Sequence, residues 1–84
     1  MKPIFADEAW EDDLYWQKRD KRRVDRINTL IRESQGEPFA GIGKPEALKH
    51  VLSGFWSRRI TDEHRMVYRI EENGLLIAQL RFHF

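Results

Sequence analysis

Hydrophobic residues recur at a helical spacing in the first half of the chain, which predicts two helices there. The first is expected to begin at Asp7, whose carboxylate would serve as the N-cap, and to end near Arg19. Trp10 and Leu14 are four residues apart and should both point at the core. The flank of this helix is expected to carry Tyr15 or Trp16.

The second predicted helix has the clearer pattern. Asp20 can cap it, and a set of apolar side chains then repeats with the period of a helix that buries one face. The buried positions are Val24, Ile27, Leu30 and Ile31. The same phase places basic residues on the outward side, namely Lys18, Arg22 and Arg26.

The second half of the chain alternates between apolar and polar residues, as strands do. It follows a segment from Ser34 to Glu46 that contains three glycines and two prolines and is expected to be a loop. The dipeptide Asn73-Gly74 is a strong hairpin signal, and Thr61 to Glu63 is a second expected turn. A short segment near the N-terminus, Lys2–Phe5, is also expected to be a strand. The other expected strands are Gly54–Ile60, Arg65–Glu71 and Leu75–Phe84.

Alternation divides the last two predicted strands into two faces. The face expected to cover the helices carries Met66, Tyr68, Ile70, Leu76, Ala78, Leu80 and Phe82. The opposite face carries Arg65, Val67, Arg69, Ile77, Gln79, Arg81 and His83. The order β-α-α-β-β-β therefore predicts an α+β fold in which both helices pack on one face of a mainly antiparallel sheet.

Composition limits what such a chain can do. Its 84 residues suffice for a single domain over 1–84, and the lack of cysteine excludes disulfide scaffolds, cysteine-ligated zinc and thiol catalysis. We find no signal peptide and no apolar run of membrane length, so we expect a cytoplasmic protein without membrane contact. Gly41 to Pro45 lacks the glycine spacing and the hydroxyl residue of a phosphate loop. The three histidines are far apart in sequence, so no metal and no other cofactor is predicted.

The net charge of +1 hides an uneven distribution of charge. Met1 to Trp16 holds one basic and five acidic residues, whereas Gln17 to Gln35 holds seven basic and three acidic residues. A basic cluster can attract a polyanion, but on a helix it is more often a solvated face. Both interpretations stay open at this point.

The sheet face away from the helices combines side chains suited to a phosphodiester. They are Arg59, Arg65, Arg81 and His83 on the sheet, with Glu46 and Lys49 on a loop able to fold over it. Arginine holds phosphate with fixed donors, and histidine and a carboxylate can act as acid and base. RNA supplies its own nucleophile, the 2′-hydroxyl, so no metal is required. The other histidines, His50 and His64, are assigned to structure or solvent.

Three stretches of the sequence, in this order along the chain, resemble a known family. They are Pro38–His50, Leu52–Thr61 and Glu63–Tyr68, and the match extends to Trp10, Tyr15-Trp16, Asp20-Lys21 and Arg81–Phe84. In these residues, across nearly the whole chain, the sequence resembles the YoeB/Txe family of bacterial toxins in the RelE/ParE superfamily.

The resemblance implies a microbial-ribonuclease-like fold and a ribosome-dependent mRNA interferase, an endoribonuclease that cuts mRNA in the ribosomal A site. It also implies a YefM/Phd-type antitoxin that holds the toxin inactive, and a homodimer. Residue by residue, Glu46 corresponds to the general base, His83 to the general acid and Arg65 to the cation that stabilises the transition state. Lys49 and Arg59 correspond to phosphate contacts. Ribosomal RNA then becomes a natural counterpart for Lys18, Arg22 and Arg26.

One departure from the family pattern concerns the end of the chain. The family usually ends in His-Tyr, whereas this sequence ends in His83-Phe84. Phe84 can stack on a base or pack beside His83 but has no hydroxyl for the scissile phosphate. Two alternatives follow: a ParE-like toxin that binds without cleaving, disfavoured because Glu46, Arg65 and His83 are all present, and an attenuated toxin that mainly binds its antitoxin as a co-regulator.

Overall fold

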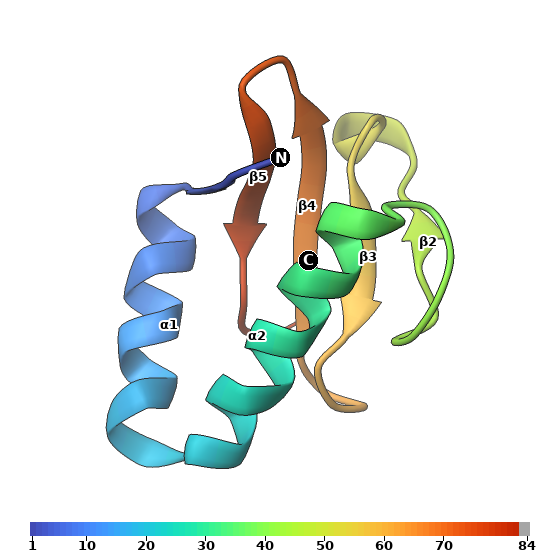
Figure 1. The fold of residues 1–84 in the computed structure, drawn as a ribbon. Coiled ribbons are helices and arrows are strands. Elements are labelled where there is room, and N and C mark those ends of the chain that lie inside the picture. Colours follow the sequence, from blue (N-terminus) through green and yellow to red (C-terminus); the bar gives the residue numbers. More distant parts are fainter. Residues whose placement is uncertain (83–84) are drawn as a thin grey trace.

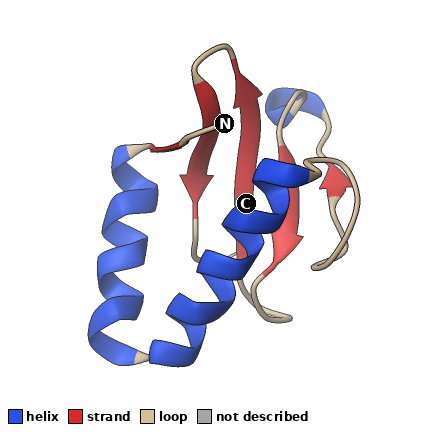
Figure 2. Cartoon of the chain, viewed as in Figure 1, coloured by secondary structure: helices blue, strands red, loops and turns tan. Residues whose placement is uncertain are grey.

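The computed structural model describes residues 1–82. It contains a mixed sheet of five strands with both long helices on one face (Figures 1 and 2). The strand order is β1-β5-β4-β3-β2, in which β1 runs parallel to β5 and all other neighbours are antiparallel. The elements are β1 (Pro3–Phe5), α1 (Asp7–Arg19), α2 (Lys21–Gly36), β2 (Glu46–Ala47), the 3-10 helix η1 (His50–Leu52), β3 (Trp56–Arg59), β4 (Arg65–Glu71) and β5 (Gly74–Gln79). The predicted α+β class is confirmed, and β2 is a strand that the sequence pattern did not reveal.

Helix α1 has a different start and a different buried face from those predicted. Ala6 occupies the N-cap, so the prediction of Asp7 as the cap is wrong; Asp7 lies in the acidic first turn, where it suits the helix dipole. The prediction that Trp10 points at the core is also wrong, because Trp10 is 48% exposed and Trp16 is 7% exposed. Ala9 and Trp16 lie two turns apart on the inward face, and the rotation of about 100° per residue carries Trp10 to the side.

Helix α2 follows the sequence pattern closely. The Asp20 carboxylate accepts hydrogen bonds from the backbone N–H groups of Arg22 and Arg23, which confirms the predicted cap. Ile27, Leu30 and Ile31 are buried and Val24 is partly buried, as predicted. The helix continues through Ser34 to Gly36, so the connecting loop covers only residues 37–45.

The two central strands differ in how well alternation predicts their faces. In β4, Met66 and Tyr68 are fully buried against the helices, as predicted. In β5 the assignment of the first residues is wrong, because Leu75 and Ile77 belong to the core whereas Leu76 is partly exposed. Assignment to the core was also wrong for Ala78 and for Ile70 and Phe82, which are 38% and 51% exposed.

A β-bulge explains the inverted face of β5. The register between β4 and β5 shifts at Val67/Tyr68, where Val67 pairs with Gln79 and Tyr68 pairs with Ile77. One residue of β5, Ala78, is therefore left without an opposite partner. Beyond the bulge Leu80 returns to the core, as predicted. The strand ends at Gln79, and the predicted strand residues His83 and Phe84 lie outside the described residues.

The hairpin between β4 and β5 turns one residue earlier than the sequence predicts. Glu71 pairs with Gly74, so Glu72 and Asn73 form the turn and Gly74 is the first residue of β5. Gly74 has a φ of 151°, and a Cβ atom there would lie 2.2 Å from the carbonyl oxygen of Lys2. The glycine is thus required by the close passage of Lys2 and by its own positive φ.

Arg58 is a fully buried arginine that connects the sheet to the loop after α2. Its guanidinium donates to the carbonyl oxygens of Glu37 (2.5 Å), Ala40 (2.9 Å) and Ile42 (3.0 Å) and to the Tyr68 hydroxyl (3.1 Å). That hydroxyl donates in turn to the carbonyl oxygen of Pro38 at 2.6 Å. Since Glu37 is the C-cap of α2, the cation also lies at the negative end of the helix dipole.

No helix within residues 1–82 is long and apolar enough to span a bilayer.

Replacing Arg58 should destabilise the protein strongly, because it would remove four hydrogen bonds that join the sheet to the loop after α2 and leave a cavity in place of a fully buried side chain. We expect Arg58→Ala to lower the free energy of unfolding by roughly 3 kcal/mol. Urea denaturation measures this, with Arg32→Ala, an exposed arginine of α2, as the control. Equal losses in the two variants would contradict a structural role for the buried guanidinium.

Candidate active site

The sheet face opposite the helices holds the charged residues of the candidate site. Arg59 of β3 pairs with Arg65 of β4, and their neighbours Arg58 and Met66 are buried on the helix side. Because successive residues of a strand point to opposite faces, Arg59 and Arg65 point away from the helices.

Glu46 reaches the same face from the edge strand β2. Glu46 pairs with Ser57, Ser57 with Val67 and Val67 with Gln79, so these residues form one row across four strands. Ser57 lies two residues before Arg59, and it therefore shares the face of Arg59 and Arg65. The structure thus brings together Glu46, Arg59 and Arg65, which the sequence analysis had singled out from three separate segments.

Glu46 and Arg65 form a loose ion pair with unequal exposure. Arg65 Nη1 lies 3.9 Å from Glu46 Oε1, and their side chains are 13% and 67% exposed respectively. Within residues 1–82, the Nε atoms of Arg59 and Arg65 are buried and have no hydrogen-bond partner. The site therefore presents an accessible carboxylate next to a guanidinium that is mostly buried and fixed in the sheet.

The remaining predicted phosphate contacts are more dispersed. Lys49 is exposed and follows Glu46 by three residues, just before η1. Arg81 does not extend from a strand face as predicted, because β5 ends before it and its guanidinium lies 3.5 Å from the centre of the Tyr15 ring on α1. Arg19 lies 4.0 Å from the same ring centre, and two groups this close must occupy opposite faces of the ring.

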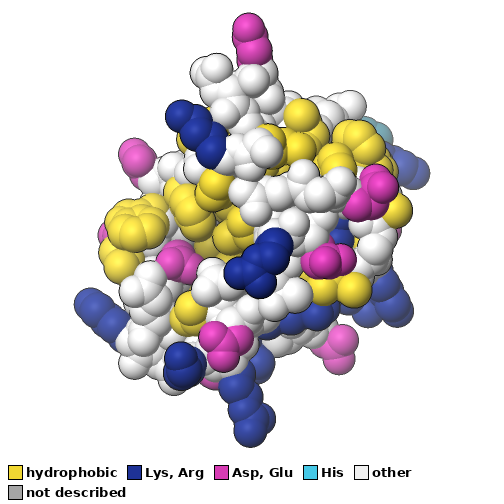
Figure 3. Space-filling view, viewed as in Figure 1, with side chains coloured by type: hydrophobic (Ala, Val, Ile, Leu, Met, Phe, Trp, Pro, Cys, Tyr) yellow, Lys and Arg dark blue, Asp and Glu magenta, His cyan; other side chains and the backbone are white. Residues whose placement is uncertain are grey.

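The basic residues of the helices lie around the turn between α1 and α2. Lys18 and Arg22 are exposed, as predicted. Arg26 does not point outward, because its guanidinium donates to the carbonyl oxygen of Arg59 at 3.1 Å and thereby connects α2 to the end of β3. Figure 3 shows Lys and Arg side chains gathered along the lower half of the molecule.

The chain segment that leads to the C-terminus passes beside Arg65. The backbone N–H of Arg65 donates to the carbonyl oxygen of Phe82 at 3.2 Å, and the N–H of Phe82 donates to His64 Nδ1 at 2.8 Å. His83 and Phe84, the last two predicted site residues, lie outside the described residues. Sequence reasoning had assigned His64 to structure or solvent, and its contact with a residue 18 positions away left no local signal.

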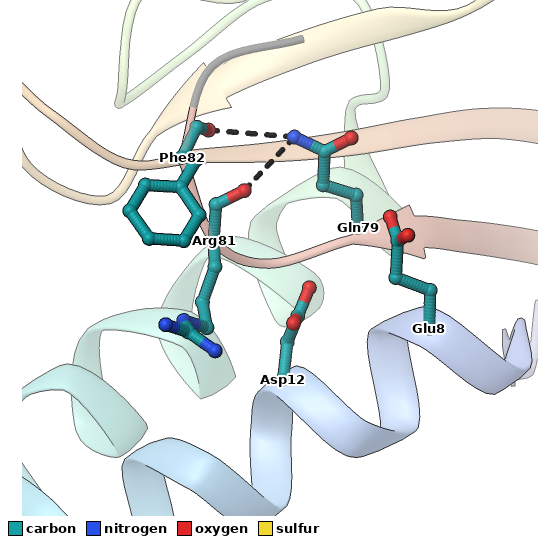
Figure 4. Close-up of a pocket in the computed structure, with 5 residues that line it drawn as sticks. All are labelled: Glu8, Asp12, Gln79, Arg81 and Phe82. Carbon is teal, nitrogen blue, oxygen red and sulfur yellow. Dashed lines mark hydrogen bonds between the residues drawn. The ribbon is translucent and has the colours of Figure 1, made fainter.

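A cavity of about 230 Å³ opens next to this segment (Figure 4). It is lined by Glu8, Asp12, Gln79, Arg81 and Phe82. The Asp12 carboxylate accepts a hydrogen bond from the backbone N–H of Leu80 at 2.9 Å, and the Gln79 amide donates to the carbonyl oxygens of Arg81 and Phe82. The walls of the cavity thus hold the backbone that leaves β5.

The same fold occurs in bacterial toxins. The chain superposes on the M. tuberculosis toxin–antitoxin complex RelBE2 with a TM-score of 0.70 at 20% identity, covering 98% of this chain and 96% of that one, a likeness that concerns the fold alone. It superposes on a YoeB/ParE toxin from Agrobacterium tumefaciens with a TM-score of 0.96 at 50% identity, with both chains fully covered.

Sequence comparison identifies the family. The model of YoeB-like toxins of bacterial type II toxin–antitoxin systems matches residues 5–84. Toxin YoeB of Escherichia coli K12 is 58% identical over the full length of both chains. A YoeB–YefM complex from Staphylococcus aureus superposes with a TM-score of 0.91 at 40% identity, covering 100% of this chain and 98% of that one. The chain belongs to the YoeB-like toxin family.

The exposure of Glu46 predicts that this residue contributes little to stability. Glu46→Gln should change the free energy of unfolding by less than about 0.5 kcal/mol, because an exposed, long ion pair is largely screened. Asp12→Asn provides the contrast: Asp12 is 9% exposed, and its carboxylate accepts the Leu80 N–H more strongly than the neutral amide oxygen of Asn can, so the change should cost about 1 kcal/mol. Urea denaturation of both variants checks this. A larger loss for Glu46→Gln than for Asp12→Asn would mean that the Glu46 carboxylate is structural.

Proposed function

We propose that this chain is an mRNA interferase: an endoribonuclease that cleaves mRNA in the A site of the ribosome by acid–base chemistry. The observation that carries the proposal is the exposed Glu46 carboxylate beside the Arg65 guanidinium, on a sheet face that Arg59 shares. This is the arrangement that attack by a 2′-hydroxyl on its neighbouring phosphate requires.

In the proposed reaction Glu46 takes the proton of the 2′-hydroxyl. The resulting oxygen attacks the phosphorus, and the bond from phosphorus to the 5′-oxygen breaks. His83 donates a proton to that leaving oxygen, so the products are a 2′,3′-cyclic phosphate and a free 5′-hydroxyl. Arg65 stabilises the extra negative charge on the phosphorane, which is the state that gains most from a fixed cation.

The other basic residues are proposed to hold the RNA chain. Arg59 is paired with Arg65 on the neighbouring strand, and Lys49 is an exposed cation near Glu46 in sequence. Arg81, whose guanidinium lies over the Tyr15 ring, is also proposed as a phosphate contact. Lys18 and Arg22 are proposed to face ribosomal RNA, with Arg26 behind them supporting the end of β3.

Two protein partners follow from the relatives. Structures of S. aureus YoeB include a YoeB–YefM complex and a YoeB dimer. We propose that this chain likewise binds a YefM-type antitoxin that blocks the site and that the free toxin forms a homodimer. Its place of action would be the cytoplasm, where ribosomes translate.

Cleavage on the ribosome tests the acid–base assignment. We expect primer extension on a defined mRNA bound to stalled ribosomes to show cuts in the A site, and Glu46→Gln and His83→Asn to slow them by about 100-fold or more, the usual contribution of a positioned acid or base. Phe84→Tyr should speed cleavage, because it supplies a hydroxyl for the scissile phosphate.

Matched control variants separate the proposed acid and base roles of His83 and Glu46 from general effects of substitution. Glu72→Gln changes an exposed carboxylate in the β4–β5 turn, and His50→Asn changes an exposed histidine outside the site, so both should cleave like the wild type. Cleavage only in Phe84→Tyr would identify an attenuated toxin that acts as an antitoxin-binding co-regulator. Absence of cleavage in every variant would favour a toxin that binds without cutting.

The basic helix turn makes a separate prediction. Lys18→Glu combined with Arg22→Glu should weaken binding to ribosomes at least tenfold at moderate salt and reduce the salt dependence, because phosphate contacts release counterions. Lys2→Glu combined with Arg32→Glu makes the same change in net charge at exposed sites elsewhere. Sedimentation with ribosomes measures the affinity, and equal weakening in both double variants would contradict a specific surface.

A further inference from the structure

After β5 the chain leaves the sheet but stays firmly bound. The N–H of Leu80 donates to the Asp12 carboxylate at 2.9 Å, and its carbonyl oxygen accepts from the Trp16 indole N–H at 3.0 Å. The Gln79 amide donates to the carbonyl oxygens of Arg81 and Phe82, and Figure 4 shows it reaching both. Residues 80–82 therefore behave as an extension of the folded core.

The last described residue, Phe82, is held in a conformation that its own backbone does not favour. Its φ is +59°, in the left-handed region that a residue with a Cβ adopts only when its surroundings impose it. His64 accepts the N–H of Phe82, and the backbone N–H of Arg65 donates to the Phe82 carbonyl oxygen. Two consecutive residues thus grip Phe82 from both sides, and the second of them carries the proposed transition-state cation.

His64 is itself fixed in place. Its side chain is 12% exposed, and its ring lies edge-on to Trp16 with 4.9 Å between the ring centres and 5.2 Å from the Phe82 ring centre. Its backbone N–H donates to the Thr61 hydroxyl, and its carbonyl oxygen accepts from Ile60 and Thr61. Nδ1 accepts a hydrogen bond from the Phe82 N–H and so acts as an acceptor there, while Nε2 lies 3.8 Å from the Glu63 carboxylate.

We propose that His64 is a positioning residue for the proposed cleavage reaction. By accepting the Phe82 N–H at Nδ1, it fixes the backbone of Phe82, which is hydrogen-bonded to Arg65 and directly precedes the proposed general acid His83 in sequence. The inference rests on the proposed function for its catalytic consequence, but the hydrogen bond itself can be tested without activity. A side chain that only donates cannot replace His64, because the group to be held is an N–H.

The pair His64→Asn and His64→Gln isolates the acceptor. Asn places its Oδ1 close to where Nδ1 lies, since both atoms are bonded to Cγ, whereas the acceptor of Gln is one bond further away. Both variants lose the ring and its packing against Trp16 and carry the same amide group, so they differ by the single methylene that moves the acceptor.

Amide exchange of Phe82, followed by NMR, reads the hydrogen bond directly. We expect His64→Gln to speed this exchange at least tenfold and His64→Asn to leave it within threefold of the wild type. The wild type should also show a scalar coupling across the bond between the Phe82 amide nitrogen and His64 Nδ1, a measurement that needs no variant to fold. Absence of that coupling, or equal exchange in His64→Gln and wild type, would overturn the proposal.

The rate of single-turnover cleavage measures whether the hydrogen bond from Phe82 to His64 affects catalysis. We expect His64→Gln to slow the cleavage step at least tenfold with ribosome affinity unchanged, and His64→Asn to recover most of the rate. Equal rates in the two variants would overturn the positioning role even if the hydrogen bond exists. A wild type that cleaves nothing would overturn the proposed function and the catalytic consequence, while the exchange of Phe82 would still decide whether His64 holds the segment.

Discussion

The buried guanidinium of Arg58 is the interaction on which the rest of the structure depends. A cation in the core is costly unless its donors are used, and here the partners are carbonyl groups of the loop after α2 and the hydroxyl of Tyr68. The same loop is fixed a second time by the bond from the Arg59 N–H to the Gly43 carbonyl oxygen, at 2.7 Å. These contacts define where the loop ends, and therefore where the edge strand with Glu46 begins.

The candidate site is assembled from parts that differ in rigidity. Arg65 belongs to a strand with neighbours on both sides, and its side chain is mostly buried, so the cation is fixed before any ligand arrives. Glu46 stands on a strand of two residues at the edge of the sheet and is largely in solvent. This division suits a site in which charge stabilisation needs a fixed group and proton transfer needs an accessible one.

The sequence alone predicted the helices and the antiparallel strands, because these depend on local periodicity. It also singled out Glu46, Arg59 and Arg65, which the structure brings to one face and whose roles stay predictions. It failed where a distant contact overrides a local rule. The bulge at Ala78 reverses which residues of β5 face the core, and an alternating pattern does not indicate where a residue is inserted. Trp10 and Trp16 are equally apolar, and only packing against Leu80 and His64 selects Trp16 for the core. The roles of Arg58 and His64 likewise depend on partners that are far away in sequence.

The parallel pairing of β1 with β5 determines when this fold can form. The first strand has a single neighbour, and that neighbour is the last strand, so the pairing spans nearly the entire chain. Leu80, which anchors α1 through Trp16 and Asp12, comes later still. A nascent chain that has not yet exposed these residues can form helices but cannot complete the sheet or seat α1, because contacts of such high sequence separation close last. Folding of the toxin is thereby delayed until residues 75–80 have been synthesised, and products of interrupted translation that lack these residues lack the framework of the site.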